Sequence, residues 1–280
     1  MLTPAYLGSL LLEDLVVVDV GARWGASDRW RPFGPRVKVV GFEPDERECA
    51  RLAANEPDVT YVPLALGAKK GNATLYRTVE PACSSMFPPV EGLASRRPAL
   101  AVMRQNGEES VSVIALDDWL ADSPFDAVHV LKLDTQGSEL AILQGAQHAL
   151  TDVRMLQVEV ELNPLYEGQP LFGDVDRFLR DRGFELWRLR NLTHYGLSDV
   201  PADAVVVKDR HFFDTQIVEI AGGGGQLFWA DAYYVATDLL KSGPVSEEVG
   251  IRDACSVAGF GLLDLAASRL GAAGLATDVQ

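Results

Sequence analysis

The fold of this chain is decided by residues 16–25, which read Val16-Val17-Val18-Asp19-Val20-Gly21-Ala22-Arg23-Trp24-Gly25. Their β-branched run predicts a short buried strand, and the turn after it carries glycines at positions 21 and 25. Residues 39–44 predict a second apolar strand, which ends in Glu43, 22 residues past Gly21. A glycine turn after one strand and an acid after the next are typical of a nucleotide-type site at the carboxyl edge of a doubly wound sheet.

The spacing of the two glycines distinguishes between cofactors. A dinucleotide pyrophosphate requires the pattern G-x-G-x-x-G, which turns backbone amides and a helix N-terminus toward its negative charge. Gly21-x-x-x-Gly25 after Asp19 instead suits a cofactor without phosphate, and S-adenosylmethionine (SAM) fits because an acidic rim tolerates its sulfonium and amino group. The spacing argues against an NAD-dependent oxidoreductase, whose Tyr-x-x-x-Lys pair for hydride transfer the sequence also lacks.

Glu43 and Asp19 each have a functional and a structural interpretation. Glu43 is expected to accept hydrogen bonds from the ribose 2′- and 3′-hydroxyls, and its alternative is a helix-terminal acid favoured by the helix dipole. Asp19 would bind the amino group of the methionine portion of SAM or only brace the glycine turn, and the sequence leaves both open. Gly21 and Gly25 suit a loop in which a ligand contacts the backbone.

Length and composition predict one α/β domain with additions. The chain has 280 residues, 48% of them apolar, and a formal net charge of −15, which disfavours a nucleic-acid partner. Cys49, Cys83 and Cys255 lie far apart and form neither a disulfide framework nor a zinc pattern. No apolar run approaches the ~20 residues of a membrane span, and Glu13 and Asp14 interrupt the apolar N-terminus. We therefore expect a cytoplasmic protein that needs no metal site.

Apolar runs alternate with helical patterns along the chain, which predicts βαβ units around a mostly parallel sheet. The expected domain covers residues 16–240, between an N-terminal segment, 1–15, and a C-terminal helical extension, 241–280, that would cover the core or form a homodimer contact. Residues 71–116 interrupt the rhythm with a strand pair around a proline-rich connection, expected to act as a lid. Further strands are predicted at 59–66, 127–134, 154–162, 184–189 and 232–236, and helices at 45–55, 138–150 and 172–182.

Residues 131–139, Leu-Lys-Leu-Asp-Thr-Gln-Gly-Ser-Glu, and 142–146, Ile-Leu-Gln-Gly-Ala, resemble the signature of the FkbM-type SAM-dependent methyltransferases. The family form reads I-K-x-D-x-E-G-x-E followed by L-x-G-A, so Gln136 stands where an acid is frequent. Further motifs occur in the order of the family, and the resemblance runs from about residue 16 to residue 238. They are Val20-Gly21-Ala22, Gly41-Phe42-Glu43-Pro44, Ala65-Leu66-Gly67, Leu116-Asp117-Asp118, residues 164–172 and Ala230-Asp231-Ala232.

This resemblance implies a Rossmann-like class I methyltransferase fold. It also implies SAM-dependent O-methylation of a hydroxyl on a sugar, glycan or specialised metabolite. The resemblance adds Ala22, Pro44, Ala65 and Leu66 to the expected cofactor contacts. The acceptor varies widely in the family and does not carry over. Because Gln136 departs from the family form, a SAM-binding partner protein without catalysis stays open as the alternative.

Asp134 is the first of two predicted catalytic residues. It ends the strand 127–134, and open α/β sheets bind their ligands at the carboxyl ends of strands. Alternation places Lys132 on the same face as Asp134, and a lysine near the end of an apolar strand should be paired or line a cleft. The alternative is that Asp134 caps the helix that begins near Ser138.

Glu159 is the second predicted catalytic residue. Gln157, Glu159 and Glu161 alternate with apolar residues, whereas a strand covered on both faces should be continuously apolar. The pattern predicts a cleft, a water-lined gap or an edge. Glu159 or Glu161 would then help to remove the hydroxyl proton of the acceptor, and the alternative is a solvated strand face.

Several other polar residues have mainly structural interpretations. His129 lies early in its strand and is expected to be a core histidine. Asp117 and Asp118 resemble the N-cap of a helix. Residues 163–166 would shape the acceptor pocket, and His194 and Tyr195 are candidates for its rim.

Overall fold

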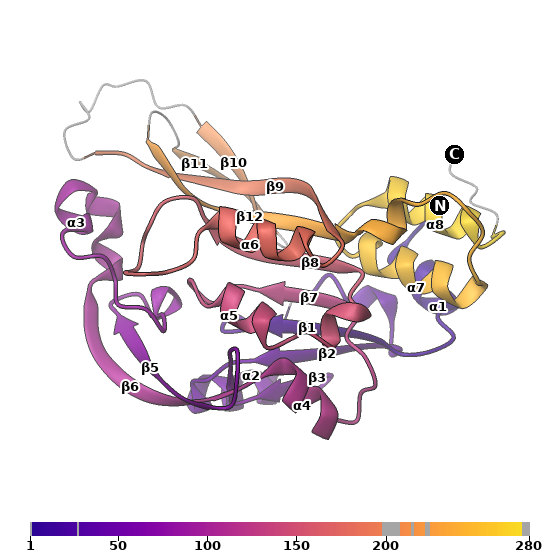
Figure 1. The fold of residues 1–280 in the computed structure, drawn as a ribbon, viewed down its shortest axis with the longest axis horizontal. Helices are drawn as coiled ribbons and strands as arrows, with labels where there is room; N and C mark the ends of the chain where they lie inside the picture. Colours follow the sequence, from indigo (N-terminus) through magenta and orange to yellow (C-terminus); the bar gives the residue numbers. More distant parts are fainter. Residues whose placement is uncertain (1, 27, 198–207, 214–215, 222–224, 276–280) are drawn as a thin grey trace.

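The computed structural model describes residues 2–26, 28–197, 208–213, 216–221 and 225–275. Its centre is a seven-stranded sheet in the order β3-β2-β1-β7-β8-β12-β9 (Figure 1). Neighbouring strands are parallel except at β12, which runs antiparallel to both β8 and β9. The strands are β1 Leu15–Val20, β2 Val37–Phe42, β3 Val59–Val62, β7 Val130–Leu133, β8 Met155–Glu161, β9 Phe184–Tyr195 and β12 Gln226–Ala236.

The direction of the strand order reverses between β1 and β7. From this switch point the sheet extends through β2 and β3 on one side and through β8 on the other, as in a doubly wound fold. The mostly parallel sheet confirms the Rossmann-like class I methyltransferase fold expected from the sequence. Ligands of such sheets bind outside the carboxyl ends of the strands at the switch point.

The strands β1 and β8, on either side of the central strand β7, are buried along their whole length. For β1 the apolar run explains this, because a parallel strand covered on both faces meets no water. In β8 the polar Gln157, Glu159 and Glu161 are also buried, because β12 pairs with the whole strand and places Asp231 opposite Glu159. The interpretations of β8 as a sheet edge or a solvated face are therefore wrong.

The helices begin where their sequences supply caps. The Asp45 carboxylate accepts hydrogen bonds from the N–H groups of Arg47 and Glu48 at the start of α2, and Ser246 accepts one from Val249 at the start of α7. The α-helices are α1 Pro4–Leu10, α2 Glu46–Asn55, α3 Leu93–Arg96, α4 Leu116–Asp122, α5 Glu139–Gln144, α6 Phe172–Arg180, α7 Glu247–Ala258 and α8 Leu263–Ala272.

Asp117 does not cap the helix that follows it, so that prediction is wrong. The N-cap of α4 is Ala115, and the Asp117 carboxylate instead accepts hydrogen bonds from the N–H groups of His148 and Ala149, each at 2.8 Å. These bonds fix the 3-10 turn η4 (Ala149–Thr151). The helix predicted over 138–150 is accordingly divided into α5 and η4.

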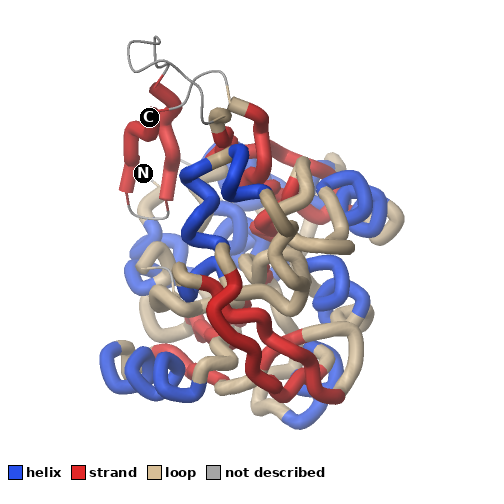
Figure 2. The backbone as a smooth tube through the Cα atoms, turned by 90° about the vertical axis from the view of Figure 1, so that its left-hand side faces the viewer, coloured by secondary structure: helices blue, strands red, loops and turns tan. Residues whose placement is uncertain are grey.

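The insertion (residues 71–116) contains the predicted strand pair, as β5 Gly71–Thr78 and β6 Gln105–Ile114, and both strands are longer than expected. The short strand β4, Ala65–Leu66, pairs parallel with β6. The single strand predicted over 59–66 is therefore split after Val62 between two sheets. Figure 2, in which the insertion faces the viewer, shows its strand pair below a group of short helices: η2 Pro81–Cys83, α3 and η3 Pro98–Met103.

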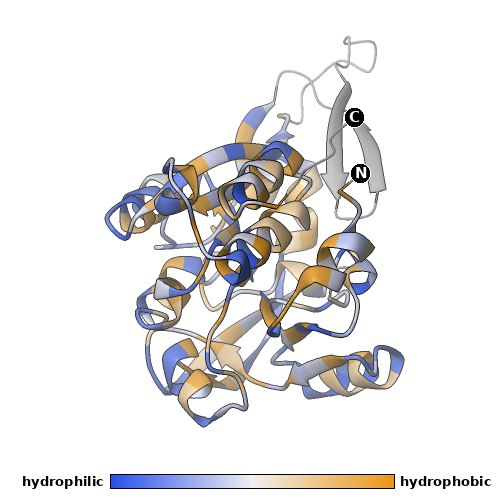
Figure 3. Ribbon diagram, turned by 90° about the vertical axis from the view of Figure 1, so that its right-hand side faces the viewer, coloured by the Kyte–Doolittle hydropathy of each residue, from blue (hydrophilic) through white to orange (hydrophobic). Residues whose placement is uncertain are grey.

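The C-terminal helices α7 and α8 pack against each other, and α7 contacts α1. They lie at the end of the molecule away from the insertion (Figures 1 and 3), and Ile251, Ala254, Leu265 and Leu270 join the main hydrophobic core. In the sequence between β9 and β12 lies a hairpin of β10 Lys208–Phe213 and β11 Gln216–Ala221, which was not predicted. Among the described residues, no helix is long and apolar enough to span a membrane.

Candidate active site

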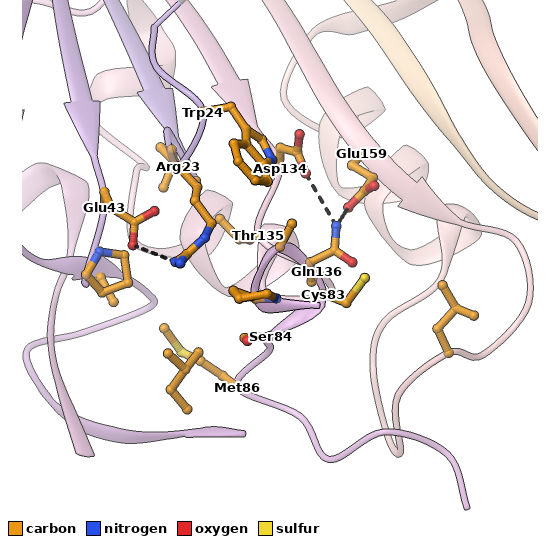
Figure 4. Close-up of a pocket in the computed structure, with 18 of the residues that line it drawn as sticks. Arg23, Trp24, Glu43, Cys83, Ser84, Met86, Asp134, Thr135, Gln136 and Glu159 are labelled. Atoms are coloured by element: carbon orange, nitrogen blue, oxygen red, sulfur yellow. Dashed lines mark hydrogen bonds and ion pairs between the residues drawn. The ribbon is translucent and has the colours of Figure 1, made fainter. Parts of the chain in front are cut away.

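A cavity of about 390 Å³ lies at the carboxyl ends of β1, β2 and β7. Ligand pockets for small molecules span roughly 300–1,000 Å³, so its size suits a cofactor together with part of an acceptor. The ends of β1, β2 and β7 form one wall, the insertion forms a second, and β8 and the strands beyond it form a third. Figure 4 shows Glu43 and Arg23 on one side of this cavity and Asp134, Gln136 and Glu159 on the other.

Gly21 allows the chain to turn at the end of β1. Its φ angle is +83°, a region that favours glycine, and a Cβ at this position would lie 1.9 Å from the carbonyl oxygen of Asp134. From the sequence, the expected role of Gly21 was to let a ligand approach the backbone. The structure adds a second reason, because the neighbouring strand end already occupies the space that a side chain would need.

Glu43 lines the cavity at the end of β2 and is almost fully buried. Its Oε1 accepts a hydrogen bond from the N–H of Asp45 at 2.8 Å and lies 3.9 Å from a guanidinium nitrogen of Arg23. Burial raises the pKa of Glu43, while the hydrogen bond from Asp45 lowers it. Within the described part of the chain, no hydrogen bond or ion pair reaches Oε2, so this oxygen can accept bonds from a ligand.

The other residues predicted to bind the cofactor divide into two groups. Pro44, Ala65 and Leu66 line the cavity, as do Gly21 and Glu43. Asp19, Ala22 and Gly25 do not line it. Asp19 is buried and pairs with Lys132, with 3.3 Å between Oδ1 and Nζ, and a Cβ on Gly25 would lie 2.3 Å from Glu56.

Asp134 and Glu159 meet across the cavity wall through the Gln136 amide. The Gln136 Nε2 donates a hydrogen bond to Oδ1 of Asp134 at 3.4 Å and a shorter one to Oε2 of Glu159 (Figure 4). Asp134 is also 3.9 Å from the Lys132 ammonium, which shows that alternation placed both on one face as predicted. The two residues predicted to be catalytic therefore lie together at one end of the cavity.

The turn that carries Gln136 is held by Glu139, at the start of α5. The buried Glu139 carboxylate accepts hydrogen bonds from the N–H of Thr135 at 2.7 Å and from the N–H of Gly137 at 2.9 Å. Burial raises the pKa of Glu139 to about 7, although these hydrogen bonds lower it. Asp134 therefore does not cap α5, and the capping interpretation does not apply, because Glu139 binds the turn from within its own helix.

Burial and neighbouring acids strongly perturb the electrostatics of Glu159. Its burial raises its pKa well above the ordinary value, and the neighbouring charges of Asp134 and Glu161 raise it further. Burial likewise raises the pKa of Glu161. A carboxyl with a raised pKa beside a cavity is a candidate for proton transfer, because its pKa is closer to the working pH than that of an ordinary carboxyl.

Several residues of the cavity wall were not predicted. They include Leu100 and Met103 of the insertion and Trp229 of β12. Leu165, from the loop 163–166, and Tyr195 also line it, whereas His194, the other residue predicted at the rim, is not among the lining residues. Trp229 donates a hydrogen bond from its indole Nε1 to the Tyr195 hydroxyl at 3.2 Å.

His129 is a core histidine, as predicted. Its Nδ1 accepts a hydrogen bond from the N–H of Val16 at 3.0 Å, and burial lowers its pKa to about 4. Within the ranges that the structure describes, no group of three or more His, Cys, Asp or Glu side chains is arranged to hold a metal ion.

Comparison with known proteins identifies the relatives of this chain. The family model of the methyltransferase FkbM domain matches residues 19–186, more than half of the chain. The 2-O-methyltransferase NoeI of Sinorhizobium fredii is 27% identical over 176 residues, which cover 59% of this chain and 72% of that protein. The hexuronic acid methyltransferase AglP of Haloferax volcanii is 23% identical over 188 residues, which cover 64% of this chain and 72% of that protein.

Among solved structures, this chain is similar to a precorrin-6y C5,15-methyltransferase from Geobacter metallireducens. The two are 15% identical, the match covers 83% of this chain and 86% of that chain, and the TM-score is 0.36.

Proposed function

Because the chain belongs to the FkbM methyltransferase family, we propose that it transfers a methyl group from SAM to a hydroxyl oxygen of a sugar in the cavity beside Gly21 and Glu159. One observation carries the proposal. The buried acid Glu43, whose Oε2 receives no hydrogen bond or ion pair from the described residues, lines the same cavity as a pair of carboxylates joined by an amide, Asp134 and Glu159.

The Gly21–Glu43 end suits the cofactor. SAM supplies a methyl carbon activated by its sulfonium. Glu43 would accept the ribose hydroxyls through Oε2, beside Gly21 in the same cavity. Pro44, Ala65 and Leu66 would contact the apolar parts of the cofactor. Asp19, Ala22 and Gly25 would support the site without lining the cavity, Asp19 through its ion pair with Lys132.

The Asp134–Glu159 end suits the acceptor. Methyl transfer is a displacement that depends mainly on alignment of the attacking oxygen, and the hydroxyl must also lose its proton. The Asp134–Glu159 pair would accept this proton. Because burial and Asp134 raise the pKa of Glu159, the pair accepts a proton near neutral pH more readily than an exposed carboxylate does.

The charge of the cavity favours an uncharged acceptor. Of the lining residues that the structure describes, Arg23 alone is cationic, and it lies 3.6 Å from Asp45 and 3.9 Å from Glu43. The acceptor end carries Asp134 and Glu159. A neutral sugar hydroxyl fits this end better than a hexuronic acid, whose carboxylate would face like charges. The net charge of −15 supports the same preference over a nucleic acid.

The proposal is tested with methyl-labelled SAM and a panel of neutral methyl pyranosides, together with the corresponding methyl uronosides. We expect transfer to a neutral member of the panel, and lower transfer to its uronoside. Asp134→Asn or Glu159→Gln should lower the rate by about 10²–10⁴-fold, the range for a positioned base. Glu167→Gln, an exposed residue just after β8, is the matched control and should leave the rate unchanged.

The alternative of a SAM-binding protein without catalysis makes a different prediction. Such a protein would bind S-adenosylhomocysteine, the demethylated product, yet transfer no methyl group to any neutral or charged hydroxyl compound. If both carboxylate variants retained the wild-type rate on an accepted sugar, alignment alone would carry the reaction, and the assignment of the base would be wrong.

A further inference from the structure

Gln136 contacts three groups with one side chain. Its Nε2 donates to Asp134 and to Glu159, and its Oε1 lies 2.9 Å from the Tyr166 hydroxyl, which can donate to it. A glutamine amide has two N–H donors as well as an acceptor, whereas a carboxylate can only accept. Glutamine can therefore donate to two ionised carboxylates at once, whereas an acid at this position offers no donor when ionised and only one when protonated.

The surroundings of Gln136 fix its position. Its φ angle is +59°, a conformation that residues other than glycine rarely adopt and that persists where neighbours enforce it. Its carbonyl oxygen accepts a hydrogen bond from the Ser85 hydroxyl of the insertion at 2.6 Å. Tyr166 is fully buried, and its hydroxyl proton is shared between Gln136 and the carbonyl of Cys83, at 2.8 Å. Contacts from two other segments thus hold Gln136 in place.

We propose that Gln136 is a positioning residue for methyl transfer, which keeps the Asp134 and Glu159 carboxylates together as one proton-accepting pair. This inference rests on the function proposed above. As the acceptor oxygen bonds to the methyl carbon, the bond from that carbon to sulfur breaks and leaves its electron pair on sulfur. The acceptor O–H bond breaks as well, and its proton passes to the carboxylate pair, so that atoms and charges balance.

The electric field around the pair makes this role measurable. Glu159 faces Asp134 after β7, Glu161 on β8, Glu139 on α5 and Asp231 on β12. Tyr166 and Tyr195 face it from the loop after β8 and from β9. The ionisable neighbours of Glu159 are therefore acids and phenols, while the Lys132 ammonium lies 3.9 Å from Asp134, the other member of the pair. The Gln136 N–H groups donate to both carboxylates and stabilise their ionised forms. Loss of these donors should raise the pH at which the pair can accept a proton.

The test compares rate–pH profiles of the wild type, Gln136→Glu and Gln136→Met. At low pH the pair is protonated and the rate falls; we expect this acid limb to move to higher pH by about one unit or more in both variants. The rate of Gln136→Glu should then be about tenfold lower on the acid limb and recover toward alkaline pH. Gln144→Glu adds the same charge on an exposed turn of α5 and should superimpose on the wild type.

Two results would overturn the proposal. An unchanged profile in both variants would remove Gln136 from the reaction, and an equal loss of rate at every pH would show a merely structural role. Thermal melting and titration with S-adenosylhomocysteine check folding. If Gln136→Glu fails to fold, Gln136→Met carries the same test with the same expected direction.

A readout without turnover separates this inference from the proposed function. Infrared difference spectra of the S-adenosylhomocysteine complex, recorded as a function of pH, follow the band of the protonated carboxyl group. The band is assigned to Glu159 by its loss in Glu159→Gln. We expect the band to persist to higher pH in both Gln136 variants than in the wild type, and an unmoved titration would overturn the inference. If no sugar were methylated but the carboxyl titration still shifted in the Gln136 variants, the proposed acceptor class would be rejected. The role of Gln136 in joining Asp134 and Glu159 would be retained.

Discussion

At the scale of single residues, Glu43 is the side chain whose role is most directly measurable. Its Oε1 supports the start of α2 through the Asp45 N–H, and its Oε2 faces the cavity. Glu43→Gln retains an acceptor for Asp45 but loses the charge that would accept two ribose hydroxyls. We expect the affinity for SAM to fall by about 1.5–3 kcal/mol, the range for hydrogen bonds to charged groups.

Isothermal titration with S-adenosylhomocysteine measures this change. Glu46→Gln, an exposed acid in the first turn of the same helix, is the control for loss of a negative charge near the helix N-terminus. Affinity that drops equally in both variants would assign the effect to helix electrostatics. Affinity that is unchanged in Glu43→Gln would place Glu43 outside the binding site.

The sequence predicted residues at strand ends better than residues inside strands. Gly21, Glu43 and Asp134 could be placed at one sheet edge because parallel strands end together. The burial of Glu159 could not, because it depends on β12, which is distant in sequence and antiparallel. The contacts of Gln136 were missed for a similar reason, since its partners come from β8, the loop after it and the insertion.

At the scale of secondary-structure elements, α7 is tied to the sheet by a buried ionic cluster. Asp253 is fully buried and accepts hydrogen bonds from Arg154 at 2.7 Å and from Arg269 of α8 at 3.1 Å. Asp253→Asn removes the charge between two buried guanidinium groups. We expect the free energy of unfolding to fall by about 3–5 kcal/mol, because an uncompensated buried charge is left behind.

Urea denaturation checks this expectation. Asp264→Asn, in the exposed first turn of α8, is the control and should change the free energy of unfolding by less than about 0.5 kcal/mol. A loss of similar size in both variants would show a general effect of charge on the helices. If Asp253→Asn left the free energy of unfolding unchanged, packing of α7 rather than the ionic cluster would hold this end together.

The elements also show where periodicity was insufficient. Alternation and helical stripes predicted the strands of the main sheet and the two C-terminal helices. They did not separate β3 from β4, because an apolar run reads the same when its halves enter different sheets. They left two roles open for the C-terminal extension, and the packing of α7 and α8 on the core shows the first of them.

At the scale of the whole molecule, stability and binding lie at opposite ends of the sheet. The C-terminal helices cover one end, and the cavity and the insertion lie at the other (Figure 1). Among the described residues, the connection 79–104 within the insertion is joined by backbone–backbone hydrogen bonds to the domain outside the insertion at two points, by Val90 to the carbonyl of Leu165 at 2.9 Å and by Glu167 to the carbonyl of Pro88 at 2.8 Å. Such a segment opens at a lower free-energy cost than a core strand does.

The last prediction concerns this insertion. Residues 79–104 contribute Cys83, Leu100 and Met103 to the cavity wall, and Ser85 binds the Gln136 carbonyl, so a bound cofactor should stabilise their closed arrangement. We expect hydrogen exchange of amides in residues 79–104 to slow by about tenfold or more when S-adenosylhomocysteine is bound. Amides of α7 and α8, which lie away from the cavity, are the internal control and should keep their rates. Equal protection of residues 79–104 in both states would make the insertion a fixed wall of the site, and the expectation of a lid would then be wrong.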